Sequence, residues 1–396
     1  MSNLEIKQML RLSDRAKIIK ESGIRKAFEM AGDMKDVIHL GLGEPDFGAP
    51  EELKTLLKMA VDEGFSHYTP NSGFFDLRSV LSDKLRDENR IDYDPATEIM
   101  VTVGAMNAIN LAMLCLVNPG DEVIIQDPAF VGFEPCTQMC GGVAVGVPLR
   151  EDRQFRIDPA DIRERITSRT RLLVINNPHN PTGAVLDPKD LEEIASIARE
   201  YDLFVLSDEV YEKLIYDGLE HTSMASLEGM KERTLTVMSF SKTFCICGWR
   251  IGFCAGPALL IRNMVKMQQS SSVHPAAPMQ KAVMFYLNRS GEFVEYIKKA
   301  YTARRDYMTG LINQIEGIHC LKPQSAFYLF VNIKQLGCTS MEFSQLLLQE
   351  YRVITIPGSA FGPGGEGYIR ICITVPVEKL QVACMRIEQA VRRFLK

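Results

Sequence analysis

The chain has 396 residues, of which 46% are apolar and 24% charged, and its formal net charge is −5. This length allows two or three structural units with a sizeable core, and the amino-acid usage is that of an ordinary globular protein. The acidic balance argues against nucleic-acid binding, and no apolar stretch approaches the ~18–20 residues of a membrane span, so we expect neither nucleic acid nor membrane as a partner.

Short apolar runs rich in Val and Ile recur through the first two thirds of the chain, each followed by a polar, Gly or Pro turn. The runs are Ile99–Val103, Glu122–Gln126, Leu172–Asn176, Phe204–Ser207, Leu235–Met238 and Ile251–Ala255. Near-continuous hydrophobicity of this kind is typical of strands buried on both faces of a parallel sheet. Helical patterns lie between the runs, most clearly at Asp187–Tyr201, where Asp187 can cap the helix and Pro188 suits its first position. This alternation predicts an α/β fold with a mainly parallel sheet.

The pattern changes after about residue 290. A long helical segment, Gly291–Ile315, comes first, and a final helix is predicted at Val377–Phe394. Strand-like runs lie between them at Phe327–Val331, Val353–Ile356 and Tyr368–Ile373. This order predicts a second, smaller α+β domain.

The ten cysteines suggest a reducing compartment. None of them forms a C-x-x-C pair, and the first 30 residues lack the apolar core of a signal peptide. Both features favour free thiols and a cytoplasmic location. Cys245 and Cys247 are close in sequence, but their spacing, without a nearby histidine, favours core or loop thiols over a metal site. We therefore expect no metal.

Polar segments follow five of the apolar runs. In open α/β sheets, ligands bind beyond the carboxyl ends of the strands, which is where these segments are expected. They are Gly104–Met106, Asp127–Phe130, Asn177–Gly183, Asp208–Tyr211 and Ser239–Lys242. One ligand at this edge of the sheet can touch all five.

The residue types describe that ligand. Lys242 offers an amine nucleophile, Asp208 can keep a ring nitrogen protonated, and Phe130 can lie against an aromatic face. Asn180 and Tyr211 can bind a ring oxygen. The groups that can bind a phosphate are Ser239, Ser241, Arg250 and the backbone N–H groups of Gly104, Ala105 and Met106. An amine-reactive aldehyde, a protonated pyridine and a phosphate together predict pyridoxal 5′-phosphate.

At this point the sequence resembles a known family, the class I and II aminotransferases of the aspartate aminotransferase fold (PLP fold type I), and in particular their bacterial and archaeal branch. The matching segments are Gly41–Phe47, Asn177–Gly183, Ser207–Tyr211, Ser239–Phe244, Gly248–Gly252 and Tyr368–Arg370, so the resemblance covers nearly the whole chain. It implies a large cofactor-binding domain, residues 46–290, whose mainly parallel sheet lies between helices. It also implies a smaller α+β domain built from both chain ends, residues 1–45 and 291–396.

The resemblance implies a role for each residue of the cofactor site. Lys242 carries the cofactor through a Schiff base and, once released, moves the proton of the substrate. Asp208 faces the pyridine nitrogen, and Asn180 and Tyr211 hold the 3-oxygen of the ring. Arg250 binds the phosphate. Lys242, Asp208 and Tyr211 are therefore the expected catalytic residues.

Three further positions follow from the same resemblance. Tyr68 matches a tyrosine that reaches the phosphate in the neighbouring subunit, which implies a homodimer. Gly43 and Asn180 are implied at the substrate. Arg370 matches the arginine whose planar fork grips the substrate carboxylate with two parallel hydrogen bonds, a task that lysine performs poorly.

These groups imply transfer of an amino group from an amino acid to a 2-oxo acid, with ping-pong kinetics. We expect a neutral or apolar L-amino acid as donor and 2-oxoglutarate or pyruvate as acceptor. A lysine that serves acidic substrates in some relatives is matched here by Met106, and residues 270–278 contain no Arg or Lys. Aspartate aminotransferase activity and PLP-dependent cysteine-conjugate β-lyase activity, which uses the same cofactor shell, are the alternatives.

Two remaining features have weaker interpretations. A ligand-sensing half of a transcriptional regulator would need a DNA-binding arm, and the roughly 40 residues before Gly41 show no helix-turn-helix pattern. The glycine-rich run Gly358–Gly367 lacks the Lys-Ser/Thr of a phosphate-binding loop, and we interpret it as a loop that closes over the substrate.

Overall fold

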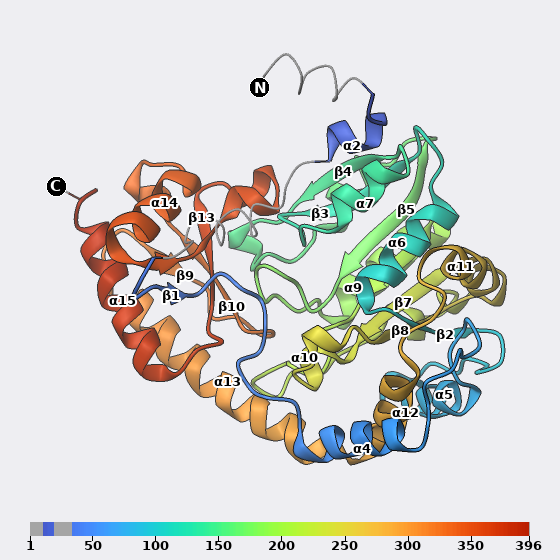
Figure 1. The fold of residues 1–396 in the computed structure, drawn as a ribbon. Helices are drawn as coiled ribbons and strands as arrows, with labels where there is room; N and C mark the ends of the chain where they lie inside the picture. The colour runs from blue at the N-terminus through green and yellow to red at the C-terminus, as the bar shows by residue number, and fades with distance from the viewer. Residues whose placement is uncertain (1–10, 20–33, 396) are drawn as a thin grey trace.

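The protein is described here by a computed structural model, which defines residues 11–19 and 34–395. A seven-stranded sheet with helices on both faces lies beside a smaller unit, which is drawn in orange and red at the left of Figure 1. No helix in these described ranges has both the length and the apolar character needed to cross a membrane.

The large sheet is mainly parallel. Its strands, in spatial order, are β2 (Ile99–Thr102), β8 (Gly252–Ala255), β7 (Thr234–Ser239), β6 (Phe204–Asp208), β5 (Thr170–Asn176), β3 (Glu122–Asp127) and β4 (Val143–Pro148). Strand β8 runs antiparallel to β2 and β7, and the other neighbouring pairs are parallel. Each of the six apolar runs overlaps a strand of this sheet, so the predicted α/β class is confirmed. Strand β4 was not predicted.

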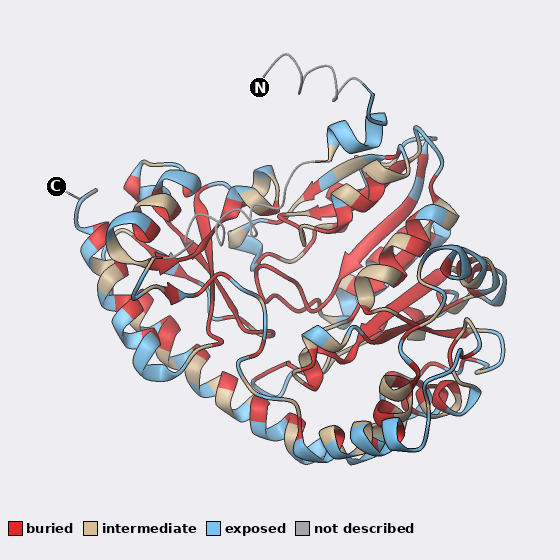
Figure 2. Ribbon diagram, in the orientation of Figure 1, coloured by how far each residue is buried: buried red, intermediate tan, exposed pale blue. Residues whose placement is uncertain are grey.

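Alternating side chains of the strands face two helical layers. Val123 and Ile125 pack with α6 (Ala105–Leu116), α7 (Phe133–Met139) and α11 (Ala258–Ser271). Ile124, between them, packs with α8 (Pro159–Arg163) and α9 (Pro188–Glu200), and the remaining helices α4 (Glu51–Asp62), α5 (Phe75–Asn89) and α12 (Ala277–Tyr286) cover β2 and β8. The strands consequently lie in the buried layer of Figure 2.

The smaller unit contains a four-stranded antiparallel sheet, in the order β12 (Ile356–Pro357), β13 (Tyr368–Cys372), β10 (Tyr328–Asn332) and β9 (His319–Cys320). Its helices are α13 (Gly291–Ile312), α14 (Ser340–Tyr351) and α15 (Val377–Val391). The segment 353–356, expected as one strand, is divided, because β11 (Val353–Ile354) pairs with β1 (Ile38–His39) whereas β12 pairs with β13.

The two described parts of the N-terminal 45 residues lie in different places. Strand β1 completes a parallel pair in the smaller unit. Helix α2 (Asp14–Ile18), capped by Ser13, instead contacts α7 beside the large sheet (Figure 1). Residues 1–10 and 20–33 of the predicted small-domain segment lie outside the described residues. The division into 46–290 and 1–45 with 291–396 stays a prediction.

Candidate active site

A cavity of about 260 Å³ lies at the carboxyl ends of the large-sheet strands and is closed on one side by the smaller unit. Most of the predicted site residues line it. They are Gly43, Ala105, Met106, Phe130, Asn180, Asp208, Tyr211, Ser239, Ser241, Lys242, Arg250 and Arg370. Gly104 and Tyr68 are not among its lining residues, but a Cβ built on Gly104 would contact Arg250, which is one of them.

Lys242 enters the cavity from the short helix α10 (Phe240–Thr243), which follows β7. The hydroxyl of Ser239 caps this helix by accepting a 3.1 Å hydrogen bond from the N–H of Ser241. The Lys242 amine donates a 2.5 Å hydrogen bond to the carbonyl oxygen of Gly43, and its nitrogen lies 3.4 Å from Cys247 Sγ. The amine is thus held by a loop that is remote in sequence.

Asp208 is the last residue of β6, and its carboxyl group is buried among the strand ends. Burial raises the pKa of Asp208 to about 7, although a hydrogen bond from the N–H of Val210 favours the ionised form. A cation in contact with this carboxyl would stabilise its charge. The position therefore suits a protonated ring nitrogen.

Arg370 extends from the middle of β13 and is 1% exposed. It donates hydrogen bonds to Asn180 Oδ1 at 3.0 Å and to the carbonyl oxygen of Gly41 at 2.7 Å, while its Nε has no partner. The described part of the chain supplies no ion-pair partner for this guanidinium. Its charge is stabilised only by hydrogen bonds to neutral oxygens and by the ring faces of Tyr328 and Phe361. A substrate carboxylate would complete its coordination.

An anion cradle lies at the start of α6. Gly104 precedes the helix with φ +72°, and a Cβ there would lie 2.6 Å from an Arg250 guanidinium nitrogen. Glycine therefore allows Arg250 to approach the first N–H groups of the helix. Ser239 and Ser241 line the same cavity. Backbone N–H groups at a helix start, hydroxyls and a guanidinium together are a donor set for phosphate.

These observations test the fit of pyridoxal phosphate. The cradle at Gly104 would accept the phosphate, and the buried carboxyl of Asp208 would accept the pyridinium. Phe130 and Tyr211 line the space between them, and Lys242 reaches it with its amine. The residues present fit the cofactor.

Among the described residues that line the cavity, six were not predicted, namely Leu42, Ile109, Asn176, Val210, Cys247 and Tyr328. Leu42, Asn176 and Val210 lie inside or beside recognised motifs, and that adjacency was a usable signal. Asn176 ties two strands together, because its side chain donates to the Asp208 carbonyl at 3.1 Å and accepts from the Asn180 N–H at 2.8 Å. Tyr328 had no such signal, because it belongs to an ordinary apolar strand.

Tyr68 projects from the surface with 88% of its side chain exposed. Its ring makes an edge contact with His274, with 5.6 Å between centroids, and His274 Nε2 accepts a 3.3 Å hydrogen bond from the N–H of Thr69. The proposed contact of Tyr68 with a neighbouring subunit stays a prediction.

The glycine-rich loop 358–367 lies against the end of β3. Asp127 Oδ1 accepts a 2.8 Å hydrogen bond from the N–H of Gly364, and the Ala129 N–H donates to the Phe361 carbonyl at 2.7 Å. The Arg370 guanidinium lies 4.8 Å from the ring centre of Phe361. This loop therefore links the large sheet to the residue proposed to bind the substrate carboxylate.

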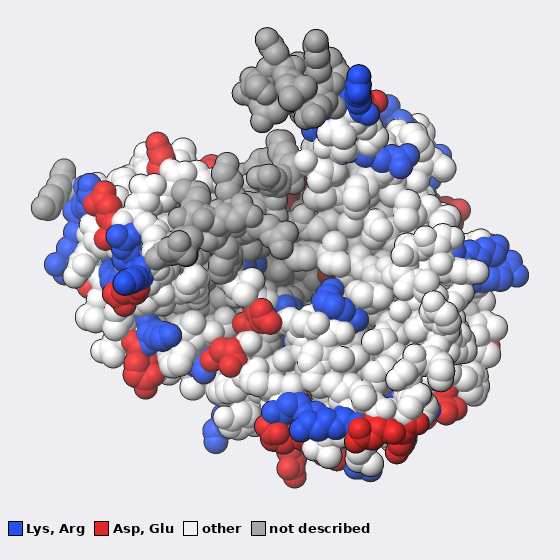
Figure 3. All heavy atoms as spheres, in the orientation of Figure 1, with Lys and Arg blue, Asp and Glu red and all other residues white. Residues whose placement is uncertain are grey.

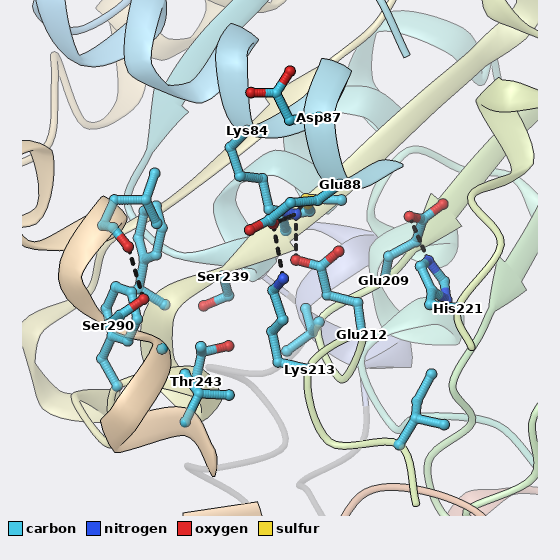
Figure 4. A pocket seen from close by; sticks show the side chains of 18 of the residues that line it. Lys84, Asp87, Glu88, Glu209, Glu212, Lys213, His221, Ser239, Thr243 and Ser290 are labelled. Atoms are coloured by element: carbon cyan, nitrogen blue, oxygen red, sulfur yellow. Dashed lines mark hydrogen bonds and ion pairs between the residues drawn. The ribbon is translucent and has the colours of Figure 1, made fainter. Parts of the chain in front are cut away.

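A larger cavity, of about 810 Å³, lies behind α10 and shares Val210 and Ser239 with the candidate site. Figure 4 shows that its charged side chains face one another. Lys84 bonds to Glu212, Lys213 lies 2.8 Å from Glu88, and His221 lies 2.8 Å from Glu209. Burial alone would raise the pKa of Glu212, but the nearby charges, first Lys84 and then Lys213, lower it to about 2. The charged side chains that line this cavity therefore form ion pairs with one another. Among the described residues, Arg370 in the smaller cavity has no such partner.

The chain is similar to known proteins over almost its whole length. The family model described as aminotransferase class I and II matches residues 35–387. An aspartate aminotransferase of Pyrococcus abyssi is 46% identical, with 96% of this chain and 98% of that protein covered. Aromatic-amino-acid aminotransferase 2 of Thermococcus litoralis is 44% identical over the same shares. The crystal structure of an aromatic aminotransferase from Pyrococcus horikoshii is 45% identical, covers 93% of this chain and 99% of its own, and superposes with a TM-score of 0.89.

Proposed function

This chain belongs to the class I and II aminotransferases, and from that premise we propose that it transfers the amino group of a neutral or apolar L-amino acid to 2-oxoglutarate or pyruvate. The enzyme is a transaminase, and its cofactor is pyridoxal 5′-phosphate. Apolar side chains in the cavity lining support the proposed donor class. They belong to Leu42, Met106, Ile109 and Phe130. Burial of an apolar donor side chain against such residues is favourable, whereas an acidic side chain would lose its hydration there.

Aspartate is the second candidate donor. It is favoured by the name of the Pyrococcus abyssi relative, which is an aspartate aminotransferase. A second carboxylate in the substrate would need a cation. Among the described residues that line the cavity, the cations are Lys242, Arg250 and Arg370. Each of them already has a proposed partner, so the pocket of this chain favours the neutral donor.

Pyridoxal phosphate, when bound, supplies an electron sink for the pair left on the substrate α-carbon. We assign the proton transfer to Lys242, whose Nζ would take the α-proton of the substrate as a base and then give it up as an acid. Asp208 holds the proton on the ring nitrogen, and a fixed carboxylate there stabilises charge that develops during the reaction. Tyr211 and Asn180 orient the ring through its oxygen.

Two arginines hold the substrate and the cofactor in place. Arg370 binds the substrate carboxylate, aided by Asn180, and so points the α-proton towards Lys242. Arg250 anchors the phosphate with the hydroxyls of Ser239 and Ser241 and the first N–H groups of α6. Because the amino group stays in the site after the first 2-oxo acid leaves, the kinetics are ping-pong.

A homodimer is part of the proposal. The middle of the face in Figure 3, over α6 and the adjoining strands, carries few charged residues. The helices that border it expose Leu114, Leu259 and Met267, each more than 40% accessible. Extended uncharged surface with exposed apolar side chains is a feature of subunit interfaces. The ring of Tyr68 contacts His274, which follows the end of α11 at Ser271, so Tyr68 lies next to one of these helices.

We also propose a cytoplasmic location. The ten cysteines are all free thiols. Proteins of oxidising compartments commonly join such residues in disulfides, whereas thiols persist where the cell keeps them reduced.

The absorption spectrum of the holoenzyme during a panel of amino donors tests reaction and donor class together. Leucine-like and phenylalanine-like donors are expected to bleach the cofactor band, and 2-oxoglutarate or pyruvate to restore it. Aspartate as clearly the best donor would overturn the donor class. Release of ammonia and pyruvate without any 2-oxo acid acceptor would favour the β-lyase alternative.

A further inference from the structure

Tyr328 connects the two binding functions of the site. It is the first residue of β10, its side chain is 1% exposed, and it lines the candidate cavity. Its hydroxyl lies 2.5 Å from the hydroxyl of Tyr211. The guanidinium carbon of Arg370 lies 4.4 Å from its ring centre. One side chain thus touches the proposed ligand of the cofactor oxygen and the proposed ligand of the substrate carboxylate.

The position of this side chain is fixed by its neighbours. A Cβ on Gly43 would lie 2.4 Å from the Tyr328 hydroxyl oxygen, so the hydroxyl sits directly over the glycine backbone. The rings of Phe327 and Tyr211 contact the Tyr328 ring, with centroids 4.9 and 5.7 Å away. A buried ring held from several sides keeps one rotamer.

The hydrogen bond between the two hydroxyls has a defined donor once the cofactor is bound. Each phenol has one proton, and burial raises the pKa of both Tyr211 and Tyr328 above the ordinary tyrosine value. If Tyr211 donates its proton to the ring oxygen, its contact with Tyr328 must be one in which Tyr328 donates. A hydrogen bond accepted by a hydroxyl strengthens the one that it donates.

We propose that Tyr328 is a positioning residue with two separable effects, an inference that rests on the proposed function. Its hydroxyl donates to Tyr211 and so strengthens the bond from Tyr211 to the ring oxygen of the cofactor. Its ring face supports the guanidinium of Arg370 in the orientation that receives the substrate carboxylate. The hydroxyl therefore acts on the cofactor, and the ring acts on substrate binding.

Two substitutions in the holoenzyme separate these effects. Tyr328→Phe removes the hydroxyl and keeps the ring. We expect the apparent pKa of the cofactor absorption band to rise by about 0.3 unit, because the ionised ring oxygen is held less tightly, with KM for the amino donor within about twofold of wild type. Tyr328→Leu also removes the ring. It should show the same band shift and a KM raised about 3–10-fold, the loss expected for a cation–π contact in a buried site.

Tyr216→Phe is the matched control. Tyr216 is equally buried, and its hydroxyl bonds to the carbonyl oxygen of Ala326, outside the cavity. Its removal should lower the thermal midpoint and leave the band and KM unchanged. In a Tyr211→Phe background, Tyr328→Phe should add no further band shift, because the coupled partner is already absent.

Three results would overturn the role of the hydroxyl. They are an unshifted band in Tyr328→Phe, an equal band shift in the control Tyr216→Phe, and a full additional shift when Tyr328→Phe is added to Tyr211→Phe. An unchanged KM in Tyr328→Leu would overturn the role of the ring, and if that variant does not fold, a raised KM in Tyr328→Phe contradicts the same point. A wild-type protein with no cofactor band and no amino transfer would instead refute the proposed function. The two failures are therefore distinct.

Discussion

The carboxylate of Asp127 and the backbone N–H of Gly364 are joined by a 2.8 Å hydrogen bond across 237 positions of sequence. Asp127 ends strand β3 of the large sheet, and Gly364 lies in the loop of the smaller unit that carries Phe361. Because the guanidinium of Arg370 lies over Phe361, this bond connects the frame of the large sheet to the substrate end of the site.

Asp127→Ala should therefore weaken substrate binding more than turnover. The variant loses the acceptor for the Gly364 N–H, so the support of Phe361 beneath Arg370 loosens. We expect KM for the amino donor to rise by about 3–10-fold, which matches the ~0.5–1.5 kcal/mol of a typical intramolecular hydrogen bond, with a smaller change in kcat. Steady-state kinetics measure both. Asp127→Asn keeps a carbonyl acceptor and should remain near wild type, and identical KM values for all three proteins would contradict the prediction.

Gly43→Ala should damage both stability and activity. The new methyl group would overlap the buried hydroxyl of Tyr328, and overpacking of this kind costs about 1–3 kcal/mol of unfolding free energy. The shift would also displace the carbonyl that accepts from Lys242. Urea unfolding and transaminase assays provide the measurements. The control is Gly48→Ala, since no atom lies within 4 Å of a Cβ built at Gly48. Equal behaviour of the two variants would argue against the close approach.

The cofactor-free protein should lose stability from Asp208 as pH rises. Burial raises the pKa of Asp208 to about 7 from an ordinary value of 3.8. The folded state then binds more protons than the unfolded state between these values, so the free energy of unfolding falls from about pH 4 to pH 7. Asp208→Asn cannot ionise and escapes this loss, which for a fully buried group amounts to up to ~4 kcal/mol. Urea titrations at pH 5 and 8 compare the two proteins, and parallel pH profiles would exclude the effect.

Cys247 should be the thiol through which alkylation blocks the site. Its sulfur lines the cavity 3.4 Å from the Lys242 nitrogen, whereas Cys254 is fully buried in β8. Treatment of the cofactor-free protein with iodoacetamide is expected to reduce the activity recovered when the cofactor is added back, and bound cofactor should slow the alkylation. Cys247→Ser should resist inactivation, and Cys254→Ser should not. Peptide mapping locates the adduct. Equal inactivation of the Cys247→Ser protein would place the reactive thiol elsewhere.

Six of the seven strands of the large sheet could be predicted from the sequence, because their residues are mostly buried and so form near-continuous apolar runs. Strand β4 could not, since it lies at the sheet edge and Val143 and Gly146 are exposed. The two-residue strands β1 and β9 are too short to show a period. The division at Thr355 depends on which partner strand lies on each side, and that information is tertiary.

The strand-end residues of the site were predictable for a similar reason. Parallel strands deliver their carboxyl ends to one edge, so Asp208 and Lys242 converge once the sheet is assumed. The assignment of their roles rested on the family resemblance. Tyr328 and Ile109 lie in apolar elements whose sequences predict only core residues. The packing of the smaller unit against the large sheet brings Tyr328 to Tyr211, and the sequence does not show that packing.

The pairing of β1 with β11 has a consequence for the order of biosynthesis. Ile38 and His39 leave the ribosome about 315 residues before their partners Val353 and Ile354. At translation rates of about 5–20 residues per second, strand β1 is synthesised roughly 15–60 s before its partner strand β11. The central sheet can assemble in that interval, so the segment that carries Gly43 is held in the catalytic pocket by this strand pair only after Val353 and Ile354 have been synthesised.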